Sequence, residues 1–138
     1  MKNAKWMLTV TVLLMSGLMA AQSLSSSAVV ANVPFDFMVN NKIIPAGECV
    51  VKSADGNVLT ISNFDARKAV LAASSHGNAA KDDRTVMVFE RYGSQYFLSE
   101  IRIKGADLSY KLPQSRAEVE LRAQNAPASQ MTLLASLK

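Results

Sequence analysis

Few residues in this chain are suited to chemistry. Among 138 residues there is one cysteine, Cys49, and one histidine, His76. A structural zinc site needs four Cys or His ligands, and a catalytic triad needs a histidine beside a nucleophile. The adjacent Asp82 and Asp83 do not match calcium, which takes six or more oxygens from a spaced pattern. The residue types therefore predict no metal, no cofactor and no nucleophilic catalysis, and His76 is expected in a solvated loop.

Cys49 admits three interpretations. Its alternation with Glu48 and Lys52 puts it on one strand face with Val51 and Ser53, as a small, partly buried residue. The alternatives are a disulfide between two chains and a catalytic thiol, which needs a nearby histidine or cation to form the thiolate. A single cysteine cannot close a disulfide within the chain, so the core alone must hold the domain.

The sequence Arg91-Tyr92-Gly93, with Tyr96 close behind it, is the other candidate site. If a two-residue turn follows Tyr92, the stem of Arg91 packs on the Tyr96 ring, with Asp36 or Glu100 as its charge partner. The functional alternative makes Arg91 an anchor for an anionic ligand. The candidate interaction residues are thus Arg91, Tyr92, Tyr96 and Cys49.

The charge pattern argues against nucleic acid as a partner. The 15 basic residues exceed the 11 acidic ones, for a net charge of +4. Apart from the adjacent Arg67 and Lys68, the basic residues are scattered singly, without runs or interleaved aromatic residues. A hydrolase would have to use scattered carboxylates, because no motif brings two of them together on a substrate. The carboxylates available are those of Glu90, Glu100, Glu118 and Glu120.

The N-terminus has the order of a secretory signal peptide. Lys2 and Lys5 precede an uncharged stretch over residues 6–21, and a polar run follows at 22–27. An uncleaved membrane anchor is the weaker alternative, because a spanning helix wants about 20 apolar residues and this stretch contains threonine, serine and glycine. Without Lys2 and Lys5 the chain keeps 13 basic residues against 11 acidic ones, a net charge of +2.

Cleavage is expected between residues 20 and 28. Signal peptidase needs small residues at positions −3 and −1. Ser26 and Ala28 satisfy both positions, whereas Ala20 or Ala21 satisfies −1 and leaves a large residue at −3. The expected product is a periplasmic or extracellular protein with no membrane span in its mature chain.

From residue 29 onward, apolar and polar residues mostly alternate, as in strands with one buried face. Strands are expected at about 31–39, 42–53, 58–64, 69–74, 85–92 and 95–103, with a polar loop at 75–83. Residues 131–137 are apolar enough for a closing strand, which is favoured, or for a second short helix. Pro34 places the first strand at an edge or gives it a bulge. The predicted fold is all-β and mainly antiparallel: a small β-barrel or sandwich of about seven strands in a single domain over 29–138.

Two local sequence signals predict specific structures, a hairpin turn and a helix. Gly93-Ser94 suits a type II′ hairpin turn, which sets Phe89 opposite Leu98 and Val88 opposite Ser99. Ser115 followed by Glu118 is a capping box, which predicts one short C-terminal helix over about 116–124.

Four motifs follow one another in the mature chain: NVPFDF at 32–37, PAGE at 45–48, FERYG-x-QYFLS at 89–99 and LPQSR-x-E-x-EL at 112–121. Together they resemble a group of small exported bacterial proteins, often from soil-type bacteria. The resemblance implies an exported β-rich domain with no assigned activity, substrate or cofactor. Cys49 departs from the pattern, which has an aromatic residue after the Gly-Glu pair.

The leading hypothesis is an exported, non-enzymatic β-domain that binds an unknown envelope protein or small ligand. The alternative is a barrel that carries an apolar ligand, with alanines leaving room inside at positions 69, 72, 73, 79 and 80. Bulky filling argues against a carrier, by Phe35, Phe37, Phe64, Phe89 and Phe97. A hydrolase is the third possibility, and the oligomeric state is left open.

Trp6 is the only tryptophan, and it lies in the proposed signal. The exported protein should therefore show tyrosine emission without tryptophan emission. A soluble extracytoplasmic product with tryptophan fluorescence would contradict the signal assignment.

Overall fold

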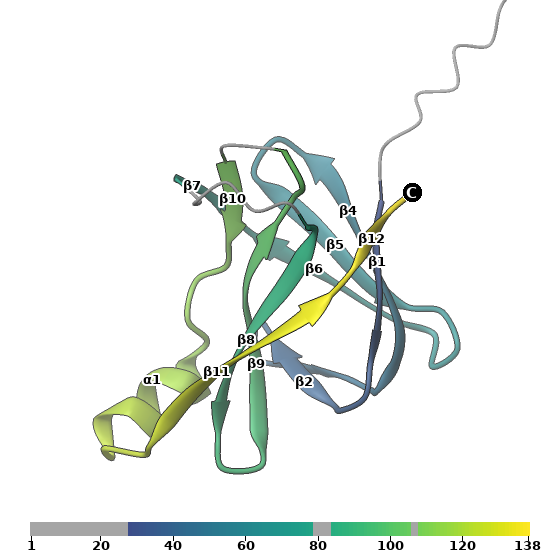
Figure 1. The fold of residues 1–138 in the computed structure, drawn as a ribbon. Helices are drawn as coiled ribbons and strands as arrows, with labels where there is room; N and C mark the ends of the chain where they lie inside the picture. Colours follow the sequence, from purple (N-terminus) through teal and green to yellow (C-terminus); the bar gives the residue numbers. More distant parts are fainter. Residues whose placement is uncertain (1–27, 79–83, 106–107) are drawn as a thin grey trace, which may run out of the picture.

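The chain forms two β-sheets in the computed structural model, which describes residues 28–78, 84–105 and 108–138 (Figure 1). The first sheet runs in the order β12 (Ser136–Leu137), β1 (Val29–Val33), β4 (Gly47–Asp55), β5 (Val58–Asn63), β6 (Lys68–Ala73). The second runs in the order β11 (Ala128–Leu134), β8 (Val86–Tyr92), β9 (Gln95–Arg102), β10 (Leu108–Lys111), β7 (Ser75–Asn78). The hairpin of β2 (Phe37–Val39) and β3 (Lys42–Ile44) joins the second sheet through β9.

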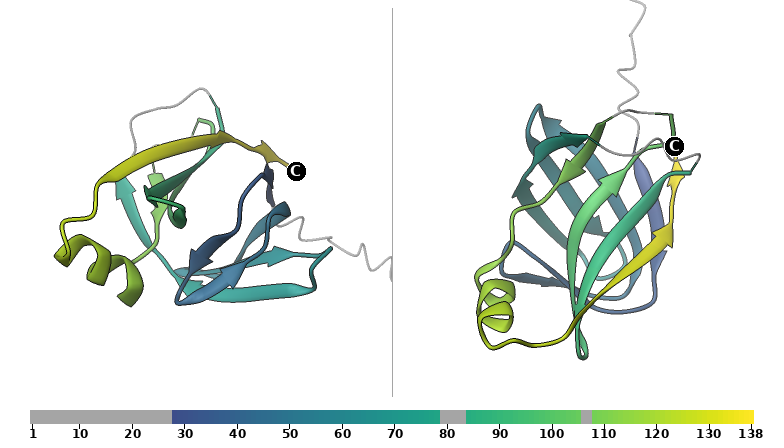
Figure 2. Two further views of the ribbon diagram at one scale, coloured as in Figure 1. Left: turned by 90° about the horizontal axis from the view of Figure 1, so that it is seen from below. Right: turned by 60° about the vertical axis from the view of Figure 1, so that its left-hand side comes forward.

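Single residues separate the strands that pass from one sheet to the other. Only Ser74 lies between β6 and β7, and only Ala135 between β11 and β12. Both continue a ladder, since the Ser74 N–H donates to the Asn57 carbonyl (2.7 Å) and the Ala135 N–H to the Thr85 carbonyl (2.9 Å). The described strands thus form a closed antiparallel ring, and Figure 2 (left) shows its perimeter from below. This confirms the all-β, barrel-like fold.

Pro34 ends the first strand instead of bending it. The single strand expected over 31–39 is wrong: β1 stops at Val33, and β2 begins at Phe37 in the other sheet. Proline has no N–H for a ladder, so the chain can leave one sheet there and enter the next. The Asn40-Asn41 turn that follows has positive φ at both residues (49° and 61°), as a type I′ hairpin requires.

Asn63 fixes the bend between β3 and β4. Its side chain is 1% exposed, and its Nδ2 donates to the carbonyls of Pro45 (2.9 Å) and Ala46 (3.2 Å). Its Oδ1 accepts from the Ala66 N–H at 3.1 Å, in the β5–β6 turn. Gly47 passes at φ +136°, with Asn63 Nδ2 only 3.1 Å from where a Cβ would stand. One buried amide therefore holds two turns together.

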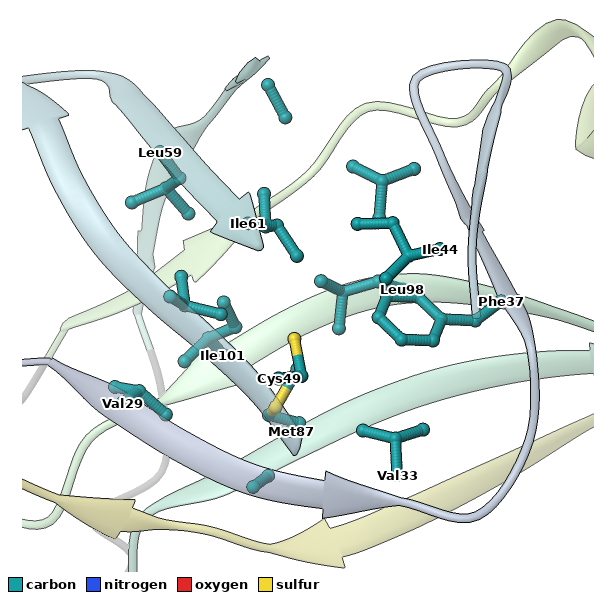
Figure 3. Close-up of a cluster of buried hydrophobic side chains, with 14 of the residues drawn as sticks. Val29, Val33, Phe37, Ile44, Cys49, Leu59, Ile61, Met87, Leu98 and Ile101 are labelled. Carbon is teal, nitrogen blue, oxygen red and sulfur yellow. The ribbon is translucent and has the colours of Figure 1, made fainter. Parts of the chain in front are cut away.

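Side chains fill the space inside the ring. Figure 3 shows part of this cluster, in which Phe37, Ile44, Ile61 and Met87 are at most 1% exposed. The ring has eight strands if β6 with β7, and β11 with β12, each count as one continuous strand. A ring of eight strands is just wide enough for its interior to be filled by side chains. The expectation that Phe64 helps to fill the interior is wrong. Phe64 lies in the β5–β6 turn and is 67% exposed.

The β8–β9 hairpin matches its predicted turn but not its whole register. Gly93 takes φ +62°, and Phe89 lies opposite Leu98 as expected. Val88 lies opposite Glu100, because a bulge at Ser99 shifts the register. The pairing of Val88 with Ser99 is therefore wrong.

Several short elements differ from the sequence prediction. Residues 75–78 form β7 rather than loop, paired with β10, which the sequence analysis did not predict. These strands escape detection because they are short and polar, and the Lys111 stem packs over Gly77, where a Cβ would come within 2.5 Å of Lys111 Cε. The described residues hold twelve strands, more than the seven or so expected. The predicted strand at the C-terminus is confirmed as β11 and β12.

Helix α1 (Arg116–Ala123) begins where the capping box predicts. Ser115 Oγ accepts from the Glu118 N–H at 3.2 Å, and Asn41 Oδ1 in the β2–β3 turn accepts from the Arg116 N–H at 3.1 Å. The helix lies beside the β8–β9 hairpin (Figure 1). Phe97 is 1% exposed and packs edge-on against Tyr92 (5.6 Å), which contacts α1.

Phe97→Ala should lower the free energy of unfolding by about 3–5 kcal/mol, because it empties a filled site outside the ring. Phe64→Ala is the matched control, and its exposed ring should change stability by no more than about 0.5 kcal/mol. Denaturant midpoints at unchanged m-value measure both. Equal effects of the two substitutions would contradict this packing.

Candidate functional site

The four sequence motifs meet at one end of the barrel, which carries α1 and the β8–β9 turn; we call it the hairpin end (Figure 1). Asp36 Oδ1 in the first motif accepts from the Ala46 N–H in the second at 2.8 Å. Phe35 stacks on Tyr96 in the third motif, with ring centroids 3.7 Å apart. Tyr92 in the third motif bonds to Glu118 in the fourth at 3.1 Å. The motifs therefore build one structural unit.

Arg91 packs on Tyr96 as the sequence predicts. Its guanidinium carbon lies 5.5 Å from the centre of the Tyr96 ring, and its Nε donates to the Gly93 carbonyl at 2.7 Å. The expected charge partners have other contacts. Asp36 accepts a hydrogen bond from the Ala46 N–H, and Glu100 forms an ion pair with Arg102 at 3.3 Å.

A surface depression of about 300 Å³ adjoins this stack. We call it the hairpin-end depression; its walls are Asp36, Phe37, Met38, Ile43, Ser94, Gln95 and Tyr96. Ile43 is 60% exposed although it is a large apolar residue. Of the residues at this site, only Tyr96 was predicted from the sequence as an interaction candidate, whereas Phe35, Met38 and Ile43 were not. The available signal was a pair of isoleucines, beginning at Ile43, two residues after the polar Asn40-Asn41 turn.

Tyr92 is a structural residue rather than an exposed contact. It is 4% exposed, and its hydroxyl donates to Glu118 Oε1. Burial and the nearby Glu118 charge raise the pKa of Tyr92. This bond attaches α1 to the barrel, which corrects the expectation that Tyr92 takes part in an interaction surface.

Glu118 is a buried carboxyl group, 5% exposed. Burial raises the pKa of Glu118, the charge of Glu90 adds to this effect, and the Tyr92 hydrogen bond and Arg122 oppose it. Glu118 also borders a cavity of about 130 Å³ between α1 and the β2–β3 turn. A raised carboxyl pKa beside a cavity is typical of a general acid. Here the same carboxyl has a structural role, because it ties the helix to β8.

Cys49 lies in the core and not at a surface. It is 1% exposed, opposite Ala31 on β1 and Asn63 on β5. Burial raises the pKa of the Cys49 thiol to about 12. The interpretation as a small buried strand residue is confirmed, and Cys49 is therefore not an interaction residue in the folded domain.

The remaining candidates lie elsewhere. His76 is on β7, not in a loop, and remains exposed, with its ring 5.2 Å from Tyr110. Asp82 and Asp83, and the cleavage residues Ala20, Ala21 and Ser26, lie outside the described residues. Within the described ranges, no three His, Cys, Asp or Glu side chains group as metal ligands.

The end of the barrel opposite the hairpin end, which we call the seam end, has an apolar pocket of about 160 Å³. Six apolar side chains and one serine line it: Val29, Val51, Ser53, Leu59, Ile101, Ile103 and Tyr110. Of the alanines expected to leave room inside, Ala72 is buried, Ala69 and Ala73 are exposed, and residues 79 and 80 are not described.

Comparison with known proteins gives no further assignment. No family model, no curated protein and no solved structure matches the chain. In the part of the chain that the structure describes, no helix has the length and apolar character needed to cross a membrane.

The Cys49 thiol should react at least about a thousandfold more slowly with a polar thiol reagent in the folded protein than in denaturant, because reaction requires opening of the core. Oxidised samples should stay monomeric. Rapid labelling of the folded state, or a reducible dimer, would contradict the buried assignment.

Glu118→Gln should flatten the dependence of stability on pH. A raised folded pKa means that the native state favours the protonated carboxyl group. That stabilisation is complete below the ordinary glutamate pKa and is lost as pH rises through the folded value. The wild type should therefore lose stability relative to Glu118→Gln as pH rises above the ordinary glutamate pKa of about 4.3. Stability curves that run parallel with pH for the wild type and Glu118→Gln would contradict a raised pKa of Glu118 in the folded state.

Proposed function

We propose that this protein is an exported, non-enzymatic β-domain that acts by binding a protein of the bacterial envelope. The N-terminal sequence supports export, with its two lysines, its uncharged stretch and its polar run. Neither the Cys49 thiol, which is buried with a high pKa, nor Glu118, which ties a helix in place, supports a catalytic role. Binding at the surface fits these residues better than chemistry does.

The observation that carries the proposal is the hairpin-end depression. Exposed Ile43 and half-buried Met38 and Tyr96 give it an apolar floor, and Asp36 lies at its wall. The Tyr96 ring is held by Phe35 and Arg91, so binding would cost little side-chain entropy. Tyrosine and arginine are enriched among residues that dominate interface energies. An apolar side chain of the partner would enter the depression.

The test is a photoreactive amino acid at Gln95, which lines the depression, in the bacterium that produces the protein. The matched control has the same group at Asn57, exposed on the β4–β5 turn. We expect one discrete protein adduct from position 95 and none from 57. Ile43→Asp should abolish that adduct with an unchanged melting temperature. No adduct at 95, or the same adduct from both positions, would contradict the proposal.

The pocket at the seam end favours the carrier as a second candidate. Its volume of about 160 Å³ is below the roughly 300–1,000 Å³ of ordinary ligand sites. It suits a single ring or a short alkyl chain, because an engineered apolar cavity of about 150 Å³ binds benzene. Native mass spectrometry of protein from its own envelope fraction decides this alternative. A bound small molecule supports a carrier, and a bound protein supports the interaction module.

A further inference from the structure

Ala28 belongs to the folded ring. Its N–H donates to the Lys138 carbonyl at 2.8 Å, and its carbonyl accepts from the Lys138 N–H at 2.8 Å. Ala28 is 8% exposed, so these bonds are largely shielded from water. The ladder continues with Val29 opposite Leu137 and Val30 opposite Ser136. Ala28 thus begins the seam between β1 and β12.

This placement of Ala28 conflicts with the cleavage site that best fits the small-residue rule of signal peptidase. Ser26 and Ala28 satisfy the small-residue rule, and a cut guided by them falls between Ala28 and Val29. The product would begin at Val29, which is 4% exposed and paired on both sides, with Leu137 and Val51. Both Ala28 bonds would be lost, and a charged amine would sit at a shielded position.

We infer that the mature protein keeps Ala28, and that signal peptidase cuts upstream, at a bond between Ala20 and Ala28. This inference rests on the proposed export. Signal peptidase acts on the unfolded chain, so folding does not block the cut at Val29. The constraint acts on the product instead: a chain that starts at Val29 lacks the outermost bonds of the seam that closes the ring.

The direct test is the N-terminal sequence and intact mass of the protein recovered from the extracytoplasmic fraction of its own bacterium. A first residue from Ala21 to Ala28 is the expected result. A first residue of Val29 would overturn this inference and leave export standing. A chain in that fraction that keeps Met1 and Trp6 would overturn the cleavage and with it this inference. Absence of the protein from that fraction would overturn the export proposal.

A stability cycle tests the physical reason independently. Four variants are compared: a chain that begins at Gln22 and a chain that begins at Val29, each with and without Lys138. Deletion of Lys138 should lower the denaturant midpoint of the longer chain, because its partner Ala28 is present. The same deletion should have a much smaller effect in the chain that begins at Val29. Equal effects in both backgrounds would show that the Ala28 and Lys138 bonds do not stabilise the seam.

Discussion

Pairing between the first and last strands closes the ring, and the remaining strands depend on it for a sheet without long open edges. A β-sheet with two free edges exposes rows of unpaired N–H and C=O groups, which closure removes. Here β12 pairs with β1, and Ser136 Oγ reaches the Val30 carbonyl across 106 positions of sequence. No disulfide assists this closure, because the single cysteine is buried and free. Backbone pairing and apolar packing therefore hold the ends together.

Polar side chains at the hairpin end hold its segments together. At this end β2 pairs with β9, and α1 lies beside the β8–β9 hairpin. Asp36, Asn63 and Glu118 supply polar contacts there, each directed at the backbone or side chain of another segment. The depression beside Tyr96 lies at the same end, and the proposed binding function rests on that surface.

Local chemistry made part of this structure predictable. The turn at Gly93, the pair Phe89 and Leu98, and the Ser115 cap follow from signals within a few residues, and all three are confirmed. The missed features depend on distant partners. β7 and β10 stabilise each other, and the Phe35 stack needs a tyrosine from another strand. Polar or isolated residues carry no periodic signal for such contacts. The sequence therefore predicted only Arg91 and Tyr96 among the residues of the candidate site.

Amide hydrogen exchange resolved along the seam tests the closed ring most directly. The account predicts that the amides of Ala28 and Lys138 are protected, together with those of Val29 and Val30, although they lie at the ends of the domain. Protection there should respond to denaturant as it does in the central strands β4 and β5. Exchange of the seam amides at the rate of an unfolded chain, with β4 and β5 still protected, would contradict closure and describe an open sandwich instead.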